Sequence, residues 1–251
     1  MFLLKPRWIY IRALKGKPFI HFTLNTFGIE SQIPYEFMKS YNDLPPDKYM
    51  IESRIDHSPD DEFPTRSRRY AKLWVDVQRN DEYIITNTQT AVFEQTVDDS
   101  RSQKRVFEPI PEVHLSKLWL LQFVTQVTAL SVANHNHSKE GQPIKSADVH
   151  LHQVRQTTYK DLDSHNSPEG IHRDGADYIV SALVMNRYNV SGGESIIYTK
   201  DQQMIYKTVL DDKEGIYQED RQQKHYVSPI STHNEGLGFR DILGIDIILN
   251  T

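Results

Sequence analysis

Residues 168–198 read PEGIHRDGADYIVSALVMNRYNVSGGESIIY and contain the pattern that decides the fold. A turn-forming Pro-Glu-Gly precedes His172 and Asp174, a run rich in β-branched residues follows, and a Gly-Gly pair marks the next turn. Residues i and i+2 of a strand project from the same face, so a strand over 171–175 would direct both side chains towards one metal ion. The stretch therefore predicts β-structure that carries two metal ligands.

Counting alone does not distinguish this pair from chance. With 11 His and 34 Asp plus Glu among 251 residues, about 1.5 His-x-acid pairs are expected, and the sequence holds two. The second pair, His233 and Glu235, lies in a polar, loop-like segment. Its context makes the pair at His172 the better candidate.

Composition narrows the class of protein. A hydrophobic content of 38% with 10% aromatic residues is enough for a substantial core, and no shift in composition divides the chain, so we expect one domain over residues 1–251. Residues 1–140 would form an N-terminal elaboration and residues 141–251 the main β-rich half. The net charge of −5 argues against nucleic acid as a partner, and the absence of cysteine leaves His, Asp, Glu and water as metal ligands.

Three local features bear on location and surface. The amino terminus lacks an uninterrupted apolar run of signal-peptide length, and the uncharged residues 118–138 are too polar for a membrane span. We therefore expect a cytoplasmic protein without membrane association. The arginines at 66, 68 and 69 are typical of a solvated or ion-paired face.

The N-terminal half predicts mixed structure. Aromatic and β-branched residues over 7–24 indicate two strands around a Lys-Gly-Lys-Pro turn, and residues 34–50 indicate a short helix closed by Pro45-Pro46. Strands are expected at 70–77 and 83–86. Apolar residues at helical spacing predict a buried amphipathic helix over 115–134.

After Gly141 the sequence alternates in the manner of strands separated by turn residues. The expected strands cover 147–159, 171–175, 177–185, 194–199, 203–209, 223–230 and 239–249. Short strands at close spacing favour a mainly β protein with α elaboration, built on a jelly-roll (double-stranded β-helix) core with N-terminal helices and strands.

A third ligand and an anion-binding group follow later in the chain. Iron oxygenase centres use two histidines and one carboxylate on one face, and His225, on a strand-like run, is the candidate for the third position. Arg240 enters an apolar terminal strand, where its guanidinium could grip a carboxylate with two hydrogen bonds. His150 and His152 offer a rival pair, but no glutamate follows within a few residues as a cupin site would require.

These motifs together resemble a known family. The set comprises Pro168 to Gly175, Asn186-Arg187, Gly192-Gly193-Glu194, Asp220-Arg221, His225 and Phe239-Arg240-Asp241. In this order it is similar to the bacterial Fe(II)/2-oxoglutarate dioxygenases that hydroxylate free L-amino acids, such as the L-isoleucine 4-hydroxylases. The similarity is close over about residues 145–251 and weak before them.

The resemblance implies Fe(II) as cofactor, 2-oxoglutarate as cosubstrate and O2 as oxidant. It assigns the iron ligands to His172, Asp174 and His225 and the far carboxylate of 2-oxoglutarate to Arg240. Arg155 falls where this family tends to place an arginine near the active site, and it would contact 2-oxoglutarate or a substrate carboxylate.

The implied reaction is hydroxylation of an unactivated C–H bond in a small molecule, an L-amino acid or close derivative, with succinate and CO2 as coproducts. The alternatives are hydroxylation or desaturation of a natural-product or peptide-linked intermediate, and a non-catalytic jelly-roll binding protein with a degenerate site. A zinc hydrolase is a poorer match because it leaves Arg240 without a role. The sequence does not indicate the oligomeric state.

Overall fold

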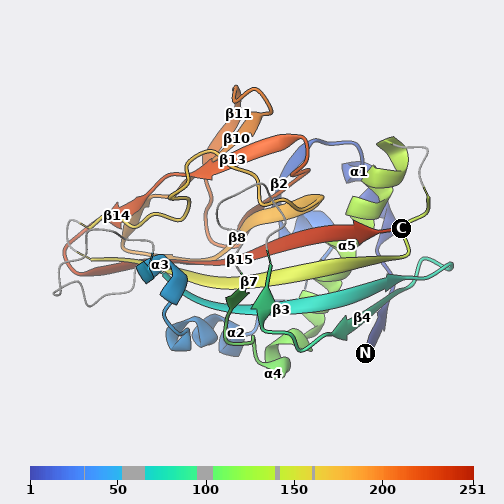
Figure 1. Ribbon diagram of the computed structural model, residues 1–251, viewed down its shortest axis with the longest axis horizontal. Helices are drawn as coiled ribbons and strands as arrows, with labels where there is room; N and C mark the ends of the chain where they lie inside the picture. The colour runs from blue at the N-terminus through green and yellow to red at the C-terminus, as the bar shows by residue number, and fades with distance from the viewer. Residues whose placement is uncertain (31, 53–65, 95–103, 139–141, 160–161) are drawn as a thin grey trace.

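The strands pair into one large antiparallel sheet with a long helix against one face and a small sheet against the other (Figure 1). The computed structural model describes residues 1–30, 32–52, 66–94, 104–138, 142–159 and 162–251. The helices are α1 (Trp8–Leu14), α2 (Tyr35–Lys39), α3 (Lys48–Glu52), α4 (Glu112–Leu115) and α5 (Leu118–Ser138), with 3-10 turns at Leu24–Phe27 and Ser40–Asp43.

Strands β1 to β6 belong to the N-terminal half: β1 (Phe2–Leu4), β2 (Phe19–Thr23), β3 (Arg66–Val77), β4 (Tyr83–Asn87), β5 (Val92–Phe93) and β6 (Arg105–Val106). The C-terminal half supplies β7 (Ser146–Tyr159), β8 (Tyr178–Tyr188), β9 (Val190–Gly192), β10 (Glu194–Thr199), β11 (Met204–Val209), β12 (Glu214–Gln218), β13 (Gln223–Val227), β14 (Ile230–Thr232) and β15 (Leu237–Asn250).

The large sheet has the strand order β1-β4-β3-β7-β15-β8-β12-β2. Its centre is β15, which pairs with β7 from Leu237 opposite Tyr159 to Asn250 opposite Ser146. Strand β3 of the N-terminal half continues the sheet beyond β7. Because register fixes which side chains share a face, the pairing of β3, β7 and β15 determines which of their residues face the small sheet.

Helix α5 covers one face of the large sheet. Its side chains Phe123, Val127 and Leu130 are buried in the same core as Leu151 of β7 and Ile245 of β15. The sequence correctly predicts this helix, but nearly all its residues from 119 to 132 are buried rather than one face alone. The expected amphipathic helix is thus a core helix with structure on every side.

The opposite face of the large sheet meets the small sheet β11-β10-β13. Ile197 of β10 packs with Val154 of β7 and Ile242 of β15 in a second apolar cluster. Two antiparallel sheets enclosing a core, with helices outside, form the jelly roll that the sequence predicts. Among the described residues, no helix is long and apolar enough to cross a membrane.

The amino-terminal strands expected over residues 7–24 are only half correct. Residues 19–23 form β2, but Trp8–Leu14 is the helix α1. Its buried residues Ile11 and Leu14 are three positions apart, which is helical spacing, and the backbone N–H of Arg7 donates to Gln126 Oε1 of α5 at 2.9 Å. A partner far away in sequence supports the start of this helix, so the local β-branched pattern was misleading.

The strand expected over 171–175 is also absent. Left-handed glycines, Gly170 at φ +79° and Gly175 at φ +88°, bend the chain, and His172 joins only an isolated bridge. Strand β12 was not predicted, because acidic and glycine residues around Glu214 resemble a turn.

Candidate metal centre

The segment that carries His172 and Asp174 is a loop held against β13. His172 and His225 exchange two backbone hydrogen bonds: the N–H of His172 donates to the His225 carbonyl at 3.0 Å, and the N–H of His225 donates back at 2.9 Å. This antiparallel bridge places the two imidazole rings 4.3 Å apart, centroid to centroid. The bridged loop, rather than the strand expected over 171–175, therefore directs the side chain of His172 towards the proposed metal position.

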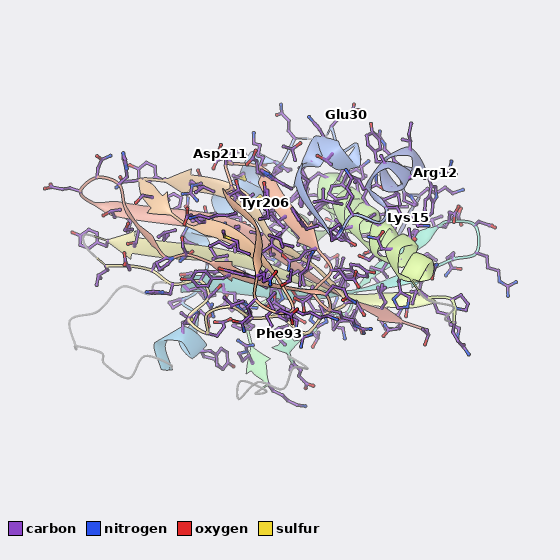
Figure 2. All side chains as sticks on the ribbon, turned by 90° about the horizontal axis from the view of Figure 1, so that it is seen from above. Arg12, Lys15, Glu30, Phe93, Tyr206 and Asp211 are labelled. Carbon is purple, nitrogen blue, oxygen red and sulfur yellow. The ribbon has the colours of Figure 1, made fainter. Side chains whose placement is uncertain are left out.

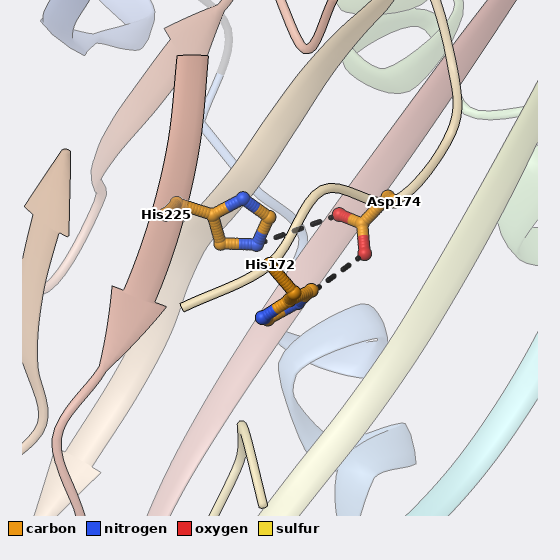
Figure 3. A group of neighbouring side chains, drawn as sticks. All are labelled: His172, Asp174 and His225. Carbon is orange, nitrogen blue, oxygen red and sulfur yellow. Dashed lines mark ion pairs between the residues drawn. The ribbon is translucent and has the colours of Figure 1, made fainter. Parts of the chain in front are cut away.

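Figure 3 shows Asp174 facing both rings. Its Oδ1 lies 3.5 Å from His172 Nε2 and its Oδ2 lies 3.5 Å from His225 Nε2. One ligand atom from each of the three residues falls within 4.8 Å of the other two. Two imidazole nitrogens and one carboxylate in this arrangement fit a divalent iron ion and leave positions open for other ligands.

Hydrogen bonds prepare His172 for this role. Its Nδ1 lies 2.8 Å from the Gly170 carbonyl, an acceptor, so Nδ1 carries the proton and Nε2 points to the carboxylates. Glu169 Oε1 is 3.1 Å from the same Nε2. Burial opposes the charged ring, but Asp174 and Glu169 outweigh it and raise the pKa of His172 to about 9.

The other two residues shift in the directions that metal binding requires. Burial lowers the pKa of His225 to about 4, so this ring is neutral. Burial alone would raise the pKa of Asp174, but electrostatic interaction with the His225 and His172 imidazoles and a hydrogen bond to His172 hold it below its usual range. The carboxylates that keep a proton on His172 would equally attract a cation in its place.

Asp220 supports the loop from below. Its carboxylate accepts hydrogen bonds from the backbone N–H groups of Asp174 (3.2 Å) and Gly175 (2.7 Å). Burial and the charge of Asp174 raise the pKa of Asp220 to about 8. Asp220 belongs to one of the sequence motifs without an evident role there, and only the fold reveals that it fixes the position of Asp174.

Arg240 lies on the inner face of β15 with no exposed surface. Its Nε, Nη1 and Nη2 atoms are all buried, and none has a hydrogen-bond partner among the described residues. Burial, followed by the charge of Arg187, lowers the pKa of Arg240 to about 9. A buried guanidinium with every donor unused is costly unless an anion binds there, and the planar fork matches a carboxylate.

A second arginine lies beside this candidate anion site. Arg187 of β8 is the register partner of Arg240, and its Nη1 is likewise buried without a partner. Gly193 lies between them: a Cβ on Gly193 would be 3.2 Å from Arg187 Nη1 and 3.4 Å from Arg240 Cδ. The sequence treats this glycine as turn material, whereas the fold makes it a wall of the pocket.

Arg155 does not reach this pocket. It pairs across the ladder with Asp241, the residue after Arg240, so it projects from the opposite face of the sheet. Its Nε and Nη2 donate to the two Asp241 carboxylate oxygens at 2.6 and 2.7 Å, and its guanidinium stacks 4.0 Å from the Phe239 ring centroid. The expected contact with 2-oxoglutarate or substrate conflicts with this placement, because alternation in the strand turns neighbours in opposite directions.

The rival pair of histidines also has other partners. His150 Nδ1 lies 3.1 Å from the Tyr70 hydroxyl, and His152 lies between Arg68 and Asp246. Of the described residues, the group able to hold a metal consists of His172, Asp174 and His225 alone. The site that the sequence favoured over the cupin arrangement is therefore the one that the fold assembles.

Comparison with known proteins supports the same chemistry. The family model described as 2OG-Fe dioxygenase matches residues 38–246. A search of curated protein sequences finds no match. Among solved structures, a BsmA homologue (Mpe_A2762) from Methylobium petroleophilum PM1 is 18% identical with a TM-score of 0.74, covering 98% of this chain and 94% of its own.

Two further structures share the fold. IDO from Bacillus thuringiensis is 19% identical with a TM-score of 0.70, covering 97% of this chain and 95% of its own. The Fe(II)/α-ketoglutarate-dependent dioxygenase TqaL is 12% identical with a TM-score of 0.60, covering 96% of this chain and 86% of its own. At these identities the similarity shows the fold, while the family match covers most of the chain. The chain belongs to the 2OG-Fe dioxygenase family and is an oxygenase that uses Fe(II), 2-oxoglutarate and O2.

Proposed function

We propose that this enzyme hydroxylates an unactivated C–H bond of a free L-amino acid or a close derivative. In this proposal His172, Asp174 and His225 hold the Fe(II), and Arg240 binds the C5 carboxylate of 2-oxoglutarate. When bound, the iron supplies the oxidation of 2-oxoglutarate by O2 to succinate and CO2, with the second oxygen atom passing to the substrate.

The observation that carries the proposal is the buried guanidinium of Arg240. Its three nitrogen atoms have no partner among the described residues, and removing such a group from water costs several kcal/mol, on the order of 3, unless a ligand compensates. Its planar donors fit a carboxylate, and the inner face of β15 is the face that meets the small sheet carrying His225. A dicarboxylate bound between Arg240 and the metal would satisfy both groups.

The protein's own groups perform binding and orientation. The Gly170 carbonyl keeps the proton of His172 on Nδ1, so Nε2 remains available as a ligand. Asp220 fixes the backbone at Asp174 and Gly175. Burial of His225 and Arg240 keeps water from competing with the ligands, which also protects a reactive site from side reactions.

The amino-acid substrate rests on the motif resemblance over the C-terminal half. The same iron chemistry on a natural-product or peptide-linked intermediate remains the alternative within this proposal. The two differ in whether a free carboxylate and amine must be accommodated beside the metal.

Binding of the metal and 2-oxoglutarate can be tested without knowing the substrate. Wild-type apoprotein titrated anaerobically with Fe(II) and then 2-oxoglutarate should develop a weak visible charge-transfer band. His172→Ala and Asp174→Ala should abolish iron binding and succinate formation. Arg240→Ala should retain iron but need a 2-oxoglutarate concentration at least tenfold higher, because a charge-assisted pair is worth about 1.5–3 kcal/mol.

The chain offers a matched control in the second His-x-acid pair. His233 and Glu235 are exposed on a loop, so His233→Ala should titrate like the wild type. Succinate formation at the wild-type rate by His172→Ala would refute the ligand assignment. An unchanged 2-oxoglutarate requirement in Arg240→Ala would refute the anchor.

The substrate class is tested by product analysis. Free L-amino acids, incubated with enzyme, Fe(II), ascorbate and 2-oxoglutarate, should include at least one that gains the mass of one oxygen atom. If none gains it while an N-acylated or peptide-linked form does, the alternative substrate class replaces the free amino acid.

A further inference from the structure

Arg68 is a buried cation on the same inner face as the candidate iron site. It is one of three arginines close in sequence that predict a solvated or ion-paired face, yet only 8% of its surface is exposed. Its guanidinium lies 4.3 Å from the Phe107 ring centroid and 5.5 Å from that of Phe93. Phe93, labelled in Figure 2, is itself only 6% exposed. The expectation of a solvated or ion-paired face is therefore wrong for Arg68.

The contacts of Arg68 leave its charge unmatched. Its Nη2 donates to Nδ1 of His152. Because a guanidinium can only donate, Nδ1 is the acceptor, the ring proton is on Nε2, and Nε2–H donates to Asp246 Oδ2 at 2.9 Å. Burial, followed by the charge of Arg68, keeps the pKa of His152 well below its usual value, so a neutral ring separates Arg68 from the carboxylate.

One donor of this arginine is unused. Among the residues that the structure describes, the buried Nε of Arg68 has no hydrogen-bond partner and no carboxylate forms an ion pair with Arg68. Burial, followed by the charge of Arg66, lowers the pKa of Arg68 to about 9. The hydrogen bonds between Asp246 and His152 and between His152 and Arg68 fix the guanidinium in place but leave its Nε–H without an acceptor.

Arg68 lies on the same face of the large sheet as Arg240 but at a distance from it. In the ladder, Arg68 pairs with Val154, whereas Arg240 pairs with the next residue on that face, Gln156. Arg68 on β3 and Arg240 on β15 are thus two strands apart and offset by two residues along the strand direction. This geometry places their Cα atoms about 12 Å apart on one face of the sheet. The two cations are too far apart to share one carboxylate.

The cluster around Arg68 also lies within reach of the metal ligands. Val154, the register partner of Arg68, belongs to the same apolar cluster as Ile197 of β10, and Ile197 pairs with His225 in the small sheet. Gly244 is the register neighbour of His152, and a Cβ there would make ordinary contacts, the nearest at 3.6 Å from His152 Cβ. An anion at Arg68 would therefore lie near the iron without occupying the 2-oxoglutarate pocket.

We propose that Arg68 binds a carboxylate of the oxidised substrate, held in position by His152 and Asp246 and flanked by Phe93 and Phe107. This inference rests on the proposed function and narrows its substrate to a carboxylic acid. A carboxylate would supply the buried guanidinium with a charge-assisted hydrogen bond at its open Nε and with a compensating negative charge.

The test compares acids with their neutral counterparts. Free L-amino acids, N-acetyl-L-amino acids and short aliphatic acids are each paired with their primary amides and assayed for stimulation of succinate formation. The wild type should respond to one or more acids, and the matching amide should need at least a tenfold higher concentration. The proposal is overturned, even without a variant, if amides stimulate succinate formation as well as the acids do. It is also overturned if no acid stimulates succinate formation.

Variants at neighbouring positions assign the effect to Arg68. Arg68→Met should raise the half-saturating concentration of the stimulating acid by about tenfold to a hundredfold, and Arg68→Lys by less, because lysine restores charge without the planar fork. Arg69→Met is the matched control, since Arg69 projects from the other face of β3 towards Glu108. An unchanged acid requirement in Arg68→Met overturns the assignment.

The visible band with Fe(II) and 2-oxoglutarate separates this inference from the function on which it rests. A wild-type protein without that band fails the proposed function. A wild-type protein that has the band and forms succinate, but does not distinguish acids from amides, fails only the assignment of Arg68.

Discussion

Gly193 shows how one missing side chain can define an anion pocket. It has φ +69°, and a Cβ would approach Arg187 Nη1, Arg240 Cδ and, at 3.0 Å, Ile230 Cγ2. The first two contacts belong to the arginines whose buried donors lack partners. A methyl group here would therefore crowd Arg187 Nη1 and contact the side chain of Arg240, which is proposed to bind 2-oxoglutarate.

We predict that Gly193→Ala raises the half-saturating 2-oxoglutarate concentration by about tenfold. A displaced guanidinium would lose part of its two-point contact with the carboxylate, and a tenfold change corresponds to a loss of about 1.4 kcal/mol. Gly16→Ala separates this effect from backbone strain. Gly16 has φ +82° but nothing within 4 Å of its Cβ, so both variants carry a left-handed alanine costing roughly 1 kcal/mol. Equal 2-oxoglutarate requirements in the two variants would contradict the prediction.

The residue scale is also where the sequence was most informative. The family motifs distinguished His172 and Asp174 from the equally spaced His233 and Glu235, and the fold brings the first pair to His225. Arg68 escaped notice because its neighbours at 66 and 69 suggested a charged surface. Only the pairing of β3 with β7 turns its side chain inward.

At the scale of elements, long strands and α5 were predictable and short, irregular segments were not. Strands β7 and β15 carry long apolar alternation, and the structure places them within two residues of the expected bounds. The loop at His172 owes its shape to Gly170, Gly175 and Asp220, and the last of these is distant in sequence. The local sequence pattern could not predict the hydrogen bonds between Asp220 and this loop. Nor could it predict the hydrogen bond from Arg7 to Gln126 at the start of α1.

The Arg155–Asp241 pair joins β7 to β15 on the face opposite the metal, and it yields a prediction at this scale. Arg155→Met should lower the free energy of unfolding by about 3 kcal/mol, because Asp241 is only 1% exposed and would lose its cation. The 2-oxoglutarate requirement should not change. Urea denaturation and succinate kinetics on one preparation measure both, and a large rise in that requirement with unchanged stability would support contact with 2-oxoglutarate instead.

Across the whole molecule, the two halves of the chain have different tasks at one site. The C-terminal half carries Arg240 and the residues proposed as metal ligands, while the N-terminal half carries Arg68, Phe93 and Phe107, which are proposed to contact the substrate. Sequence motifs predicted the first set, whereas no motif indicated a substrate contact for the second. That division has a physical cause: ligands for iron follow fixed chemistry, whereas substrate contacts depend on how distant strands are aligned.

Burial of uncharged histidines between the layers makes stability depend on pH. Burial lowers the pKa of His150 to about 4, against about 6.5 in an unfolded chain. Between these pH values the unfolded chain binds more protons, so acidification costs the fold up to about 1.4 kcal/mol per pH unit from this group. Asp246, whose pKa is raised to about 7, acts in the opposite sense, so the effect of His150 must be measured as a difference.

We predict that His150→Asn reduces the loss of stability on acidification. In metal-free protein, urea denaturation between about pH 7 and pH 4.5 should give a free energy of unfolding that falls less steeply in the variant than in the wild type, by at most one proton's contribution. His233→Asn is the control, because its ring is exposed on a loop, and it should follow the wild type. If His150→Asn also follows the wild type, then His150 does not stay neutral in the fold, and acid loss of stability must come from the other buried histidines, His152 and His225.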